Sequence, residues 1–88
     1  MRDLPIPASA LSDPEAFEYL RLWSTERGDD LSLLATFGNA EIWGIALADV
    51  GRRIARSLAG IDGSSPDDQL SAIENAFNVE LKAQLPRV

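Results

Sequence analysis

The sequence predicts an α+β protein in which three helices pack on a small β-sheet. Three observations support this fold class. Residues 39–60 carry the longest helical pattern of apolar residues, residues 31–37 alternate as a strand does, and residues 65–68 open a further helix. A chain of 88 residues is also short enough that we expect a single domain, residues 1–88.

Residues 1–10 are expected to form an extended arm. Apolar residues alternate with prolines at residues 4–7, and proline lacks an amide proton and fixes φ, so this segment suits an edge strand or a strap. Ser12 and Glu15 then have the spacing of a capping box. A first helix is therefore predicted over residues 14–26.

The strand predicted over residues 31–37 needs a partner for its backbone groups. Within the chain only the proline-interrupted residues 4–7 offer one, which leaves the second strand edge open. We therefore expect a second copy of the strand to pair antiparallel across a two-fold axis and to complete the sheet in a homodimer. The alternative is a two-stranded sheet inside a monomer, with its free edge covered by a loop.

The central helix is predicted over residues 40–59. Asn39 is a good N-cap, Glu41 complements the helix dipole, and Gly60 suits a C-terminal cap. At about 100° per residue, one set of large apolar side chains falls within about 60° of Trp43 and should face a core. The other members of this set are Leu47, Val50, Ile54 and Leu58.

A ridge of small residues lies beside that stripe. Glycine within a helix costs roughly 0.8–1 kcal/mol relative to alanine, so the glycines in this ridge favour close approach of another element. That element is another helix of the same chain or, alternatively, a second subunit. The ridge consists of Gly44, Ala48, Gly51 and Ala55. The interface residues predicted from the strand and the ridge are Leu31, Leu33, Leu34, Ala35, Phe37, Gly44, Ala48 and Gly51.

The third helix has the clearest start signal. Ser65 is an N-cap, Pro66 occupies the first helical position, and two acids follow in the first turn. Its apolar positions repeat at helical spacing, and it is expected to end before Pro86. Residues 86–88 are expected to form a loose tail.

Composition excludes several classes of function. The net charge of −6 makes a nucleic-acid partner or an anionic membrane surface a poor match, because both rely on clustered Lys and Arg. The chain has no cysteine and no histidine, which removes thiol chemistry, Cys/His zinc sites and imidazole bases. No metal, cofactor or catalytic residue is predicted, no segment is apolar enough to span a membrane, and we expect a cytoplasmic protein.

Asp49 and Arg53 are the residues that a ligand site would use. A carboxylate and an arginine four residues apart on a helix form a surface ion pair, which is the simplest interpretation. If the pair were instead buried at a subunit junction, it could bind an anionic ligand or fix the dimer register.

Several short segments, spread over nearly the whole chain, resemble a family of small proteobacterial proteins. That family is known only as a domain of unknown function. The residues that carry the resemblance are Leu4-Pro5-Ile6-Pro7, Asp13-Pro14, Leu20-Arg21-x-Trp23, Leu31-Ser32-Leu33 and Trp43-Gly44-Ile45-x-Leu47-x-Asp49-Val50. The resemblance implies a cytoplasmic bacterial protein with no catalytic residues to carry over. Many relatives have a histidine after the segment matching Asp49-Val50, where this chain has arginines, so an activity that needs that imidazole would be absent.

Two classes of function follow from these observations. We expect a non-enzymatic homodimeric module that also engages a protein partner. The alternative is a small-molecule-binding protein or weak enzyme, with its site near Asp49 and Arg53 at the subunit junction.

Overall fold

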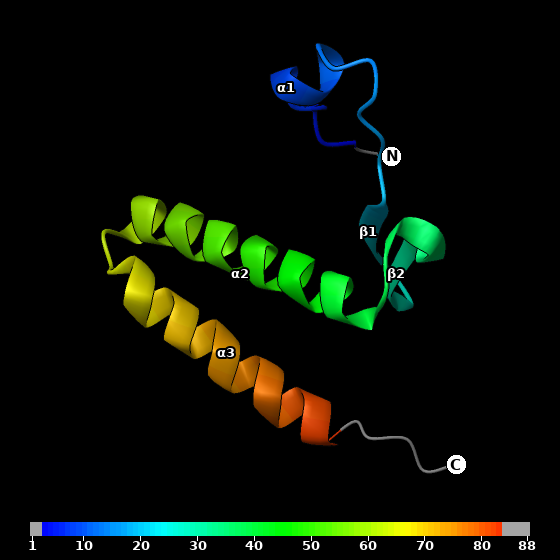
Figure 1. The fold of residues 1–88 in the computed structure, drawn as a ribbon. Helices are drawn as coiled ribbons and strands as arrows, with labels where there is room; N and C mark the ends of the chain where they lie inside the picture. The colour runs from blue at the N-terminus through cyan, green and yellow to red at the C-terminus, as the bar shows by residue number, and fades with distance from the viewer. Residues whose placement is uncertain (1–2, 84–88) are drawn as a thin grey trace. The chain divides into compact units, whose positions relative to one another are not determined.

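The computed structural model describes residues 3–83 and confirms the α+β class, with three helices and a two-stranded antiparallel sheet in that range. The chain divides into two compact units, one ending at Gly38 and the other beginning at Asn39. Figure 1 shows the β-strands in the first unit and the two long helices in the second. The single domain expected for residues 1–88 stays a prediction.

Residues 3–7 of the first unit are non-helical, with Pro7 at φ −59° and ψ 145°. The extended arm predicted for residues 1–10 is wrong at its end, because α1 (Ala8–Leu11) is helical. Residues 3–7 are not part of the sheet, so they do not supply the strand partner that we expected from them.

The helix predicted over residues 14–26 is also wrong. The apparent capping box forms a turn instead, in which the Glu15 N–H donates to Asp13 Oδ1 at 2.9 Å. The segment that follows is strand β1 (Leu20–Thr25). Its leucines alternate with Arg21, and its β-branched and aromatic residues favour a strand once a partner is available.

That partner is β2 (Gly28–Leu33), which starts earlier than the predicted strand and ends before it. Thr25 pairs with Gly28 across a two-residue loop, and the Thr25 hydroxyl donates to the Gly28 carbonyl at 2.6 Å. Gly28 has φ +111°, which only glycine adopts without strain. The last part of the predicted strand is a 3₁₀ turn, η1 (Ala35–Phe37).

The second unit is a hairpin of two helices. α2 (Ala40–Asp62) is preceded by the N-cap Asn39, whose Oδ1 accepts from the Ile42 N–H at 2.9 Å, as predicted. The helix runs past Gly60, so the predicted cap there is wrong. Gly63 ends the helix at φ 75°, and its N–H donates to the Ala59 carbonyl.

α3 (Pro66–Ala83) starts where the sequence predicts it, with Ser65 Oγ accepting from the Asp67 N–H at 3.1 Å and the Asp68 N–H at 3.4 Å. α2 and α3 run antiparallel and diverge from the loop that joins them (Figure 1). The predicted tail at residues 86–88 lies outside the described residues.

Candidate interaction surfaces

Four leucines share one face of the β-hairpin. The register pairs Leu20 with Leu33 and Leu22 with Leu31, and side chains directly opposite in an antiparallel ladder point to the same side. Leu22, Leu31 and Leu33 are exposed and Leu20 is half-buried. We call these four residues the leucine face; within the first unit it is an apolar surface without a layer of helix over it.

The other face of the hairpin carries charge. Arg21 donates two hydrogen bonds to the Glu18 carboxylate, at 2.9 Å from Nε and 2.7 Å from Nη2, and its guanidinium lies 5.9 Å from the centre of the Trp23 ring. The hydrogen bond from Arg21 lowers the pKa of Glu18, and the same bond raises the pKa of Arg21. The pair is therefore charged at neutral pH and is lost as pH falls through the lowered pKa of Glu18.

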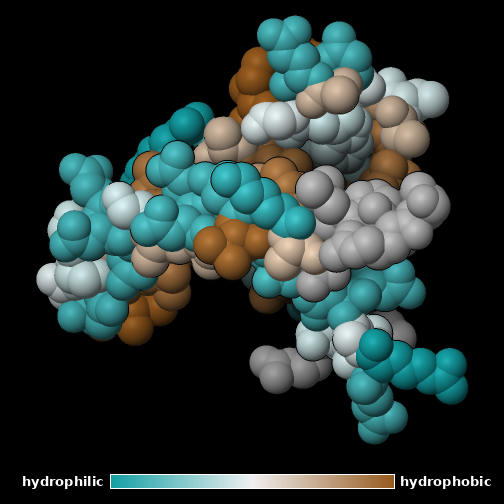
Figure 2. Space-filling model, turned by 90° about the horizontal axis from the view of Figure 1, so that it is seen from below, coloured by the Kyte–Doolittle hydropathy of each residue, from teal (hydrophilic) through white to brown (hydrophobic). Residues whose placement is uncertain are grey.

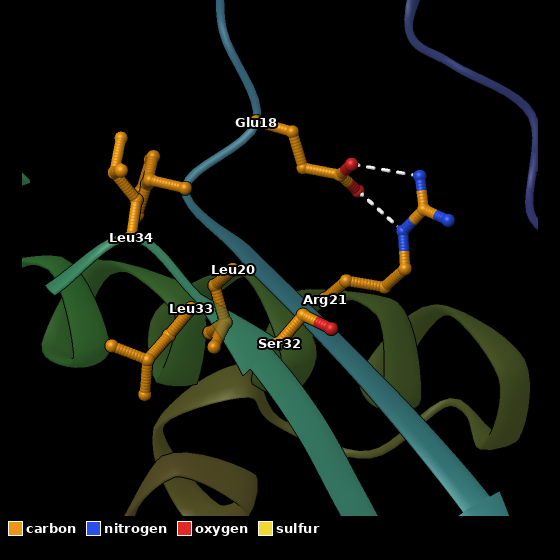
Figure 3. A pocket seen from close by; sticks show the side chains of 7 residues that line it. Glu18, Leu20, Arg21, Ser32, Leu33 and Leu34 are labelled. Carbon is orange, nitrogen blue, oxygen red and sulfur yellow. Dashed lines mark hydrogen bonds and ion pairs between the residues drawn. The ribbon is translucent and has the colours of Figure 1, made fainter.

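An open depression of about 440 Å³ lies where β1 enters the sheet and β2 leaves it. Figure 3 shows the Glu18–Arg21 pair on one side and three leucines on the other. Its lining residues are Glu18, Tyr19, Leu20, Arg21, Ser32, Leu33 and Leu34. A larger depression of about 660 Å³ lies between residues 3–7, α1 and β1, and its exposed surface is mainly apolar.

Three of the predicted interface residues have their positions fixed within the first unit. The Leu34 N–H donates to the Tyr19 carbonyl at 2.9 Å, which extends the hairpin by one bond. The Phe37 ring stacks on Tyr19 with centroids 4.1 Å apart, and Phe17 packs near both rings. Ala35 and Phe37 belong to η1, so they cannot pair as a strand with a second copy in this conformation.

The small-residue ridge of α2 faces α3 over only part of its length. Ala55 and Ala59 are buried, at 2% and 6% exposure, and are the only buried residues within residues 3–83. A Cβ added at Gly51 would lie 4.0 Å from Leu70 Cδ1, whereas one at Gly44 would meet nothing within 4 Å. The alternative in which a helix of the same chain occupies the ridge thus holds at Gly51 and Ala55, while Gly44 remains open.

The large apolar residues of α2 lie outside this contact. Leu47, Val50, Ile54 and Leu58 are between 39 and 46% exposed. The centre of their stripe lies about 115° around the helix from the midpoint between Ala55 and Ala59, so the stripe faces to one side of the buried alanines. Figure 2 shows apolar residues at the surface among hydrophilic ones.

Asp49 and Arg53 form the ion pair that their spacing predicts. Arg53 Nε donates to Asp49 Oδ2 at 2.9 Å, and Arg52 Nη2 lies 3.9 Å from Asp49 Oδ1. The Asp49 and Arg53 side chains are 47% and 73% exposed. Two arginines on one carboxylate leave a local positive charge on α2, but the pair lies on the outside of a single helix.

Within residues 3–83 no group of three or more acidic side chains is placed to hold a metal ion. No described helix combines the length and apolar character that crossing a bilayer requires.

Asp62 stabilises the loop after α2. Its carboxylate accepts hydrogen bonds from the Ser64 N–H and from Gln69 Nε2, and the hydrogen bonds from Ser64 lower the pKa of Asp62.

Sequence reasoning missed Leu20 and Leu22, because residues 14–26 had been assigned to a helix. The signal was present in the Leu20-Arg21-Leu22 alternation, which continues through a Trp and a Thr to a two-residue loop before Gly28. The spacing of helical positions, by contrast, correctly identified the apolar stripe of α2. Its assignment to the core does not hold within the helical unit, where the stripe is exposed.

Comparison with known proteins finds a solved structure of similar fold and a matching protein family. No curated protein sequence matches the chain. A solved structure from the photosynthetic bacterium Rhodopseudomonas palustrus CGA009, named a "putative pyruvate dehydrogenase", aligns with a TM-score of 0.75 and 27% identity, covering 100% of this chain and 91% of that one. The model of a family described as a domain of unknown function, DUF5076, matches residues 3–84, and the chain belongs to this family.

Proposed function

We propose that the chain is a non-enzymatic homodimeric protein-interaction module of a bacterial cytoplasm. The observation that carries this proposal is that few apolar side chains are buried although many large ones are present. Within residues 3–83 only two alanines are buried, while each unit presents exposed large apolar side chains. The bacterial origin of the structural relative is consistent with the setting.

The energetics favour association. Fully burying one large aliphatic or aromatic side chain contributes roughly 1.5–3 kcal/mol, whereas burying an alanine contributes far less. On the α2 side, the contact with α3 involves two buried alanines and a glycine beside Leu70, so the large apolar side chains of α2 contribute less than their full burial would. A partner that covered four half-exposed side chains of α2 would add several times as much.

The module has more than one surface to offer. The α2 stripe belongs to the helical unit and the leucine face to the sheet unit, so one can serve the dimer while the other engages a different protein. The outer edges of the two-stranded sheet remain a second route for the strand pairing that the sequence suggested. Because β2 already pairs with β1 of the same chain, pairing of β2 with a strand of a second copy is less necessary than the sequence suggested.

A mass measurement tests the dimer. Size-exclusion chromatography with light scattering should give twice the chain mass of 9.6 kDa at micromolar concentration, and dilution should shift the mass toward the monomer. A single-chain mass at high micromolar concentration would contradict the proposal.

The double variant Leu22→Lys, Leu31→Glu tests the leucine face of the β-hairpin. The two new side chains lie opposite each other across the strands and can pair as opposite charges, so the hairpin should be kept. The variant should lower the binding of an apolar fluorescent dye and leave the mass unchanged.

The alternative function is a small-molecule site near Asp49 and Arg53. Two features favour it: both Arg52 and Arg53 approach Asp49, and the structural relative is named for an enzyme of pyruvate, a small anion. The exposure of the pair on one helix favours the surface ion pair instead.

Asp49→Ala separates these interpretations. An exposed i, i+4 ion pair contributes about 0.3–0.5 kcal/mol, and alanine has a higher helix propensity than aspartate by a similar amount, so the free energy of unfolding should be nearly unchanged in the variant. Its thermal unfolding in the presence of pyruvate should match that of the unsubstituted protein. A pyruvate-induced rise in Tm that disappears in Asp49→Ala, but not in the matched control Asp67→Ala, would instead establish the ligand site.

A further inference from the structure

We infer that the outer edge of β1 binds an extended segment of a partner protein, which adds to the sheet as a third strand. This inference rests on the protein partner in the proposed function and names where that partner binds. We call the outward backbone groups of Leu20, Leu22 and Ser24 the β1 edge. The segment that fits this edge is apolar along its length and carries a Lys or Arg at one end.

The register of the hairpin decides which backbone groups point outward. The Leu34 N–H donates to the Tyr19 carbonyl, so these two residues form a hydrogen-bonded pair, and such pairs alternate with non-bonded pairs along an antiparallel ladder. Leu20, Leu22 and Ser24 therefore belong to non-bonded pairs, and their N–H and C=O groups point away from β2. Within residues 3–83 no hydrogen bond reaches these groups.

The outer edge of β2 is partly blocked by an aspartate. Its outward groups belong to Asp29, Leu31 and Leu33, and the Leu31 N–H already donates to Asp30 Oδ1 at 2.8 Å. Charged side chains at a strand edge discourage further pairing, and β2 carries two adjacent aspartates. The β1 edge has no charged residue at its three outward positions. The two edges of the sheet thus differ, and β1 is the one open to a third strand.

The second unit contains no strand that could pair with this edge. Its elements are the helices α2 and α3, whose backbone groups bond within each helix except at the helix ends, and within residues 3–83 the sheet has only two strands. N–H and C=O groups repeated at every second residue match the backbone of another extended chain. A strand of a different molecule is therefore the occupant that fits the β1 edge.

The depression of about 660 Å³ lies along the β1 edge. Its walls include four consecutive residues of β1, at positions 20–23, and no residue of β2, so it borders the outer side of β1. The opposite wall is formed by residues 3–7, in which Pro5 and Pro7 lack the N–H that a strand partner would need. A strand added to β1 would enter this depression, and its volume is within the range of roughly 300–1,000 Å³ that is usual for ligand clefts.

The lining of the depression favours an apolar segment. Leu4, Ile6 and Phe17 line it and are 91%, 62% and 61% exposed, and the Trp23 side chain contributes to the same surface. An added strand would cover part of these side chains, and burial of apolar surface contributes to its affinity. Valine and threonine suit the segment best, because β-branched residues favour the extended conformation.

Charge favours a basic residue at one end of the segment. The lining has one positive side chain, Arg21, and two negative ones, Asp3 and Glu18, so its net charge is −1. Arg21 is already paired with Glu18 at 2.7 Å, and the whole chain has a net charge of −6. A Lys or Arg on the partner is therefore attracted to this region, and the attraction should weaken as salt is added.

A synthetic peptide tests the β1 edge. The probe is an acetylated peptide that begins with lysine and continues with alternating valine and threonine; its control carries N-methyl groups on all core amides. In NMR spectra of the full chain, about 1 mM probe should shift the amide signals of Leu20, Leu22 and Ser24 and slow their hydrogen exchange by roughly twofold or more. The amides of Asp29 and Leu33 should keep their exchange rates, and the control peptide should change neither set.

Leu20→Pro and Leu33→Pro are the matched variants. These leucines lie opposite each other, and each proline removes one outward N–H while leaving the hydrogen bonds between β1 and β2. Leu20→Pro should weaken probe binding by roughly tenfold, because the lost donor and the proline ring both oppose a third strand. Leu33→Pro should leave it unchanged.

Three results would overturn the inference. They are no change at the β1 edge with the probe, equal binding of the N-methylated control, and shifts confined to Asp29, Leu33 or the leucine face. The last of these would still leave a protein-interaction module, bound at another surface. A monomeric mass in light scattering would contradict the homodimer and would leave binding at the β1 edge in place.

Discussion

Replacing Ile54 by glutamate is expected to convert the proposed dimer into a monomer. Ile54 lies in the middle of the exposed apolar stripe of α2, so the substitution places a carboxylate in the apolar contact of any dimer that forms through this stripe. A central anchor residue of an interface contributes 2 kcal/mol or more, and like charges add repulsion. The dissociation constant should rise by roughly 100-fold or more, as measured by analytical ultracentrifugation over a range of concentrations.

Arg56→Glu is the control for this substitution. Arg56 is exposed and lies about 160° around α2 from the centre of the stripe, so the same new side chain there should leave the mass unchanged. Far-ultraviolet circular dichroism should show that both variants keep their helices. If Ile54→Glu stayed dimeric while remaining helical, the α2 stripe would not be the interface.

Enlarging Ala55 to leucine is expected to destabilise the helical hairpin. Ala55 is 2% exposed in the contact between α2 and α3, and inserting extra carbon atoms into a packed contact costs typically 1–3 kcal/mol. Alanine and leucine have similar helix propensities, so packing should account for nearly all of the loss. Urea unfolding at a fixed protein concentration measures the change in free energy.

Ala48→Leu provides the comparison within the same ridge. Ala48 is exposed two turns earlier in α2, toward the end where the helices diverge. Leucine there should change stability by less than about 0.5 kcal/mol, as surface substitutions usually do. Equal losses at the two positions would mean that α3 covers the whole ridge, contrary to the open space found at Gly44.

The sequence predicted the helical unit well because its signals are local. Asn39 and Ser65 accept hydrogen bonds from amides two or three residues further on, and Pro66 fits the first turn of a helix without reference to the rest of the fold. The Asp49–Arg53 pair is equally local. The end of α2 was misplaced because Gly60 and Gly63 are both plausible caps, and only the backbone shows that Gly63 has positive φ.

The β-hairpin of β1 and β2 was missed because it is stabilised by residue pairs that join two different segments of the chain. An apparent capping box at Ser12 and Glu15 precedes apolar spacing compatible with a helix, and nothing within residues 12–26 reveals that Leu22 lies opposite Leu31. Assigning the helix also removed β1 from the possible partners of β2, so the open strand edge seemed larger than it is.

The position of the α2–α3 contact beside its connecting loop has a consequence for folding. Leu70 and Gly51 are close along the chain compared with the ends of the two helices, so bringing them together closes a short loop and costs little chain entropy. Contacts of this kind form within microseconds to milliseconds, ahead of pairings between distant segments. The helical hairpin is therefore suited to form early, with its apolar stripe then available to later partners.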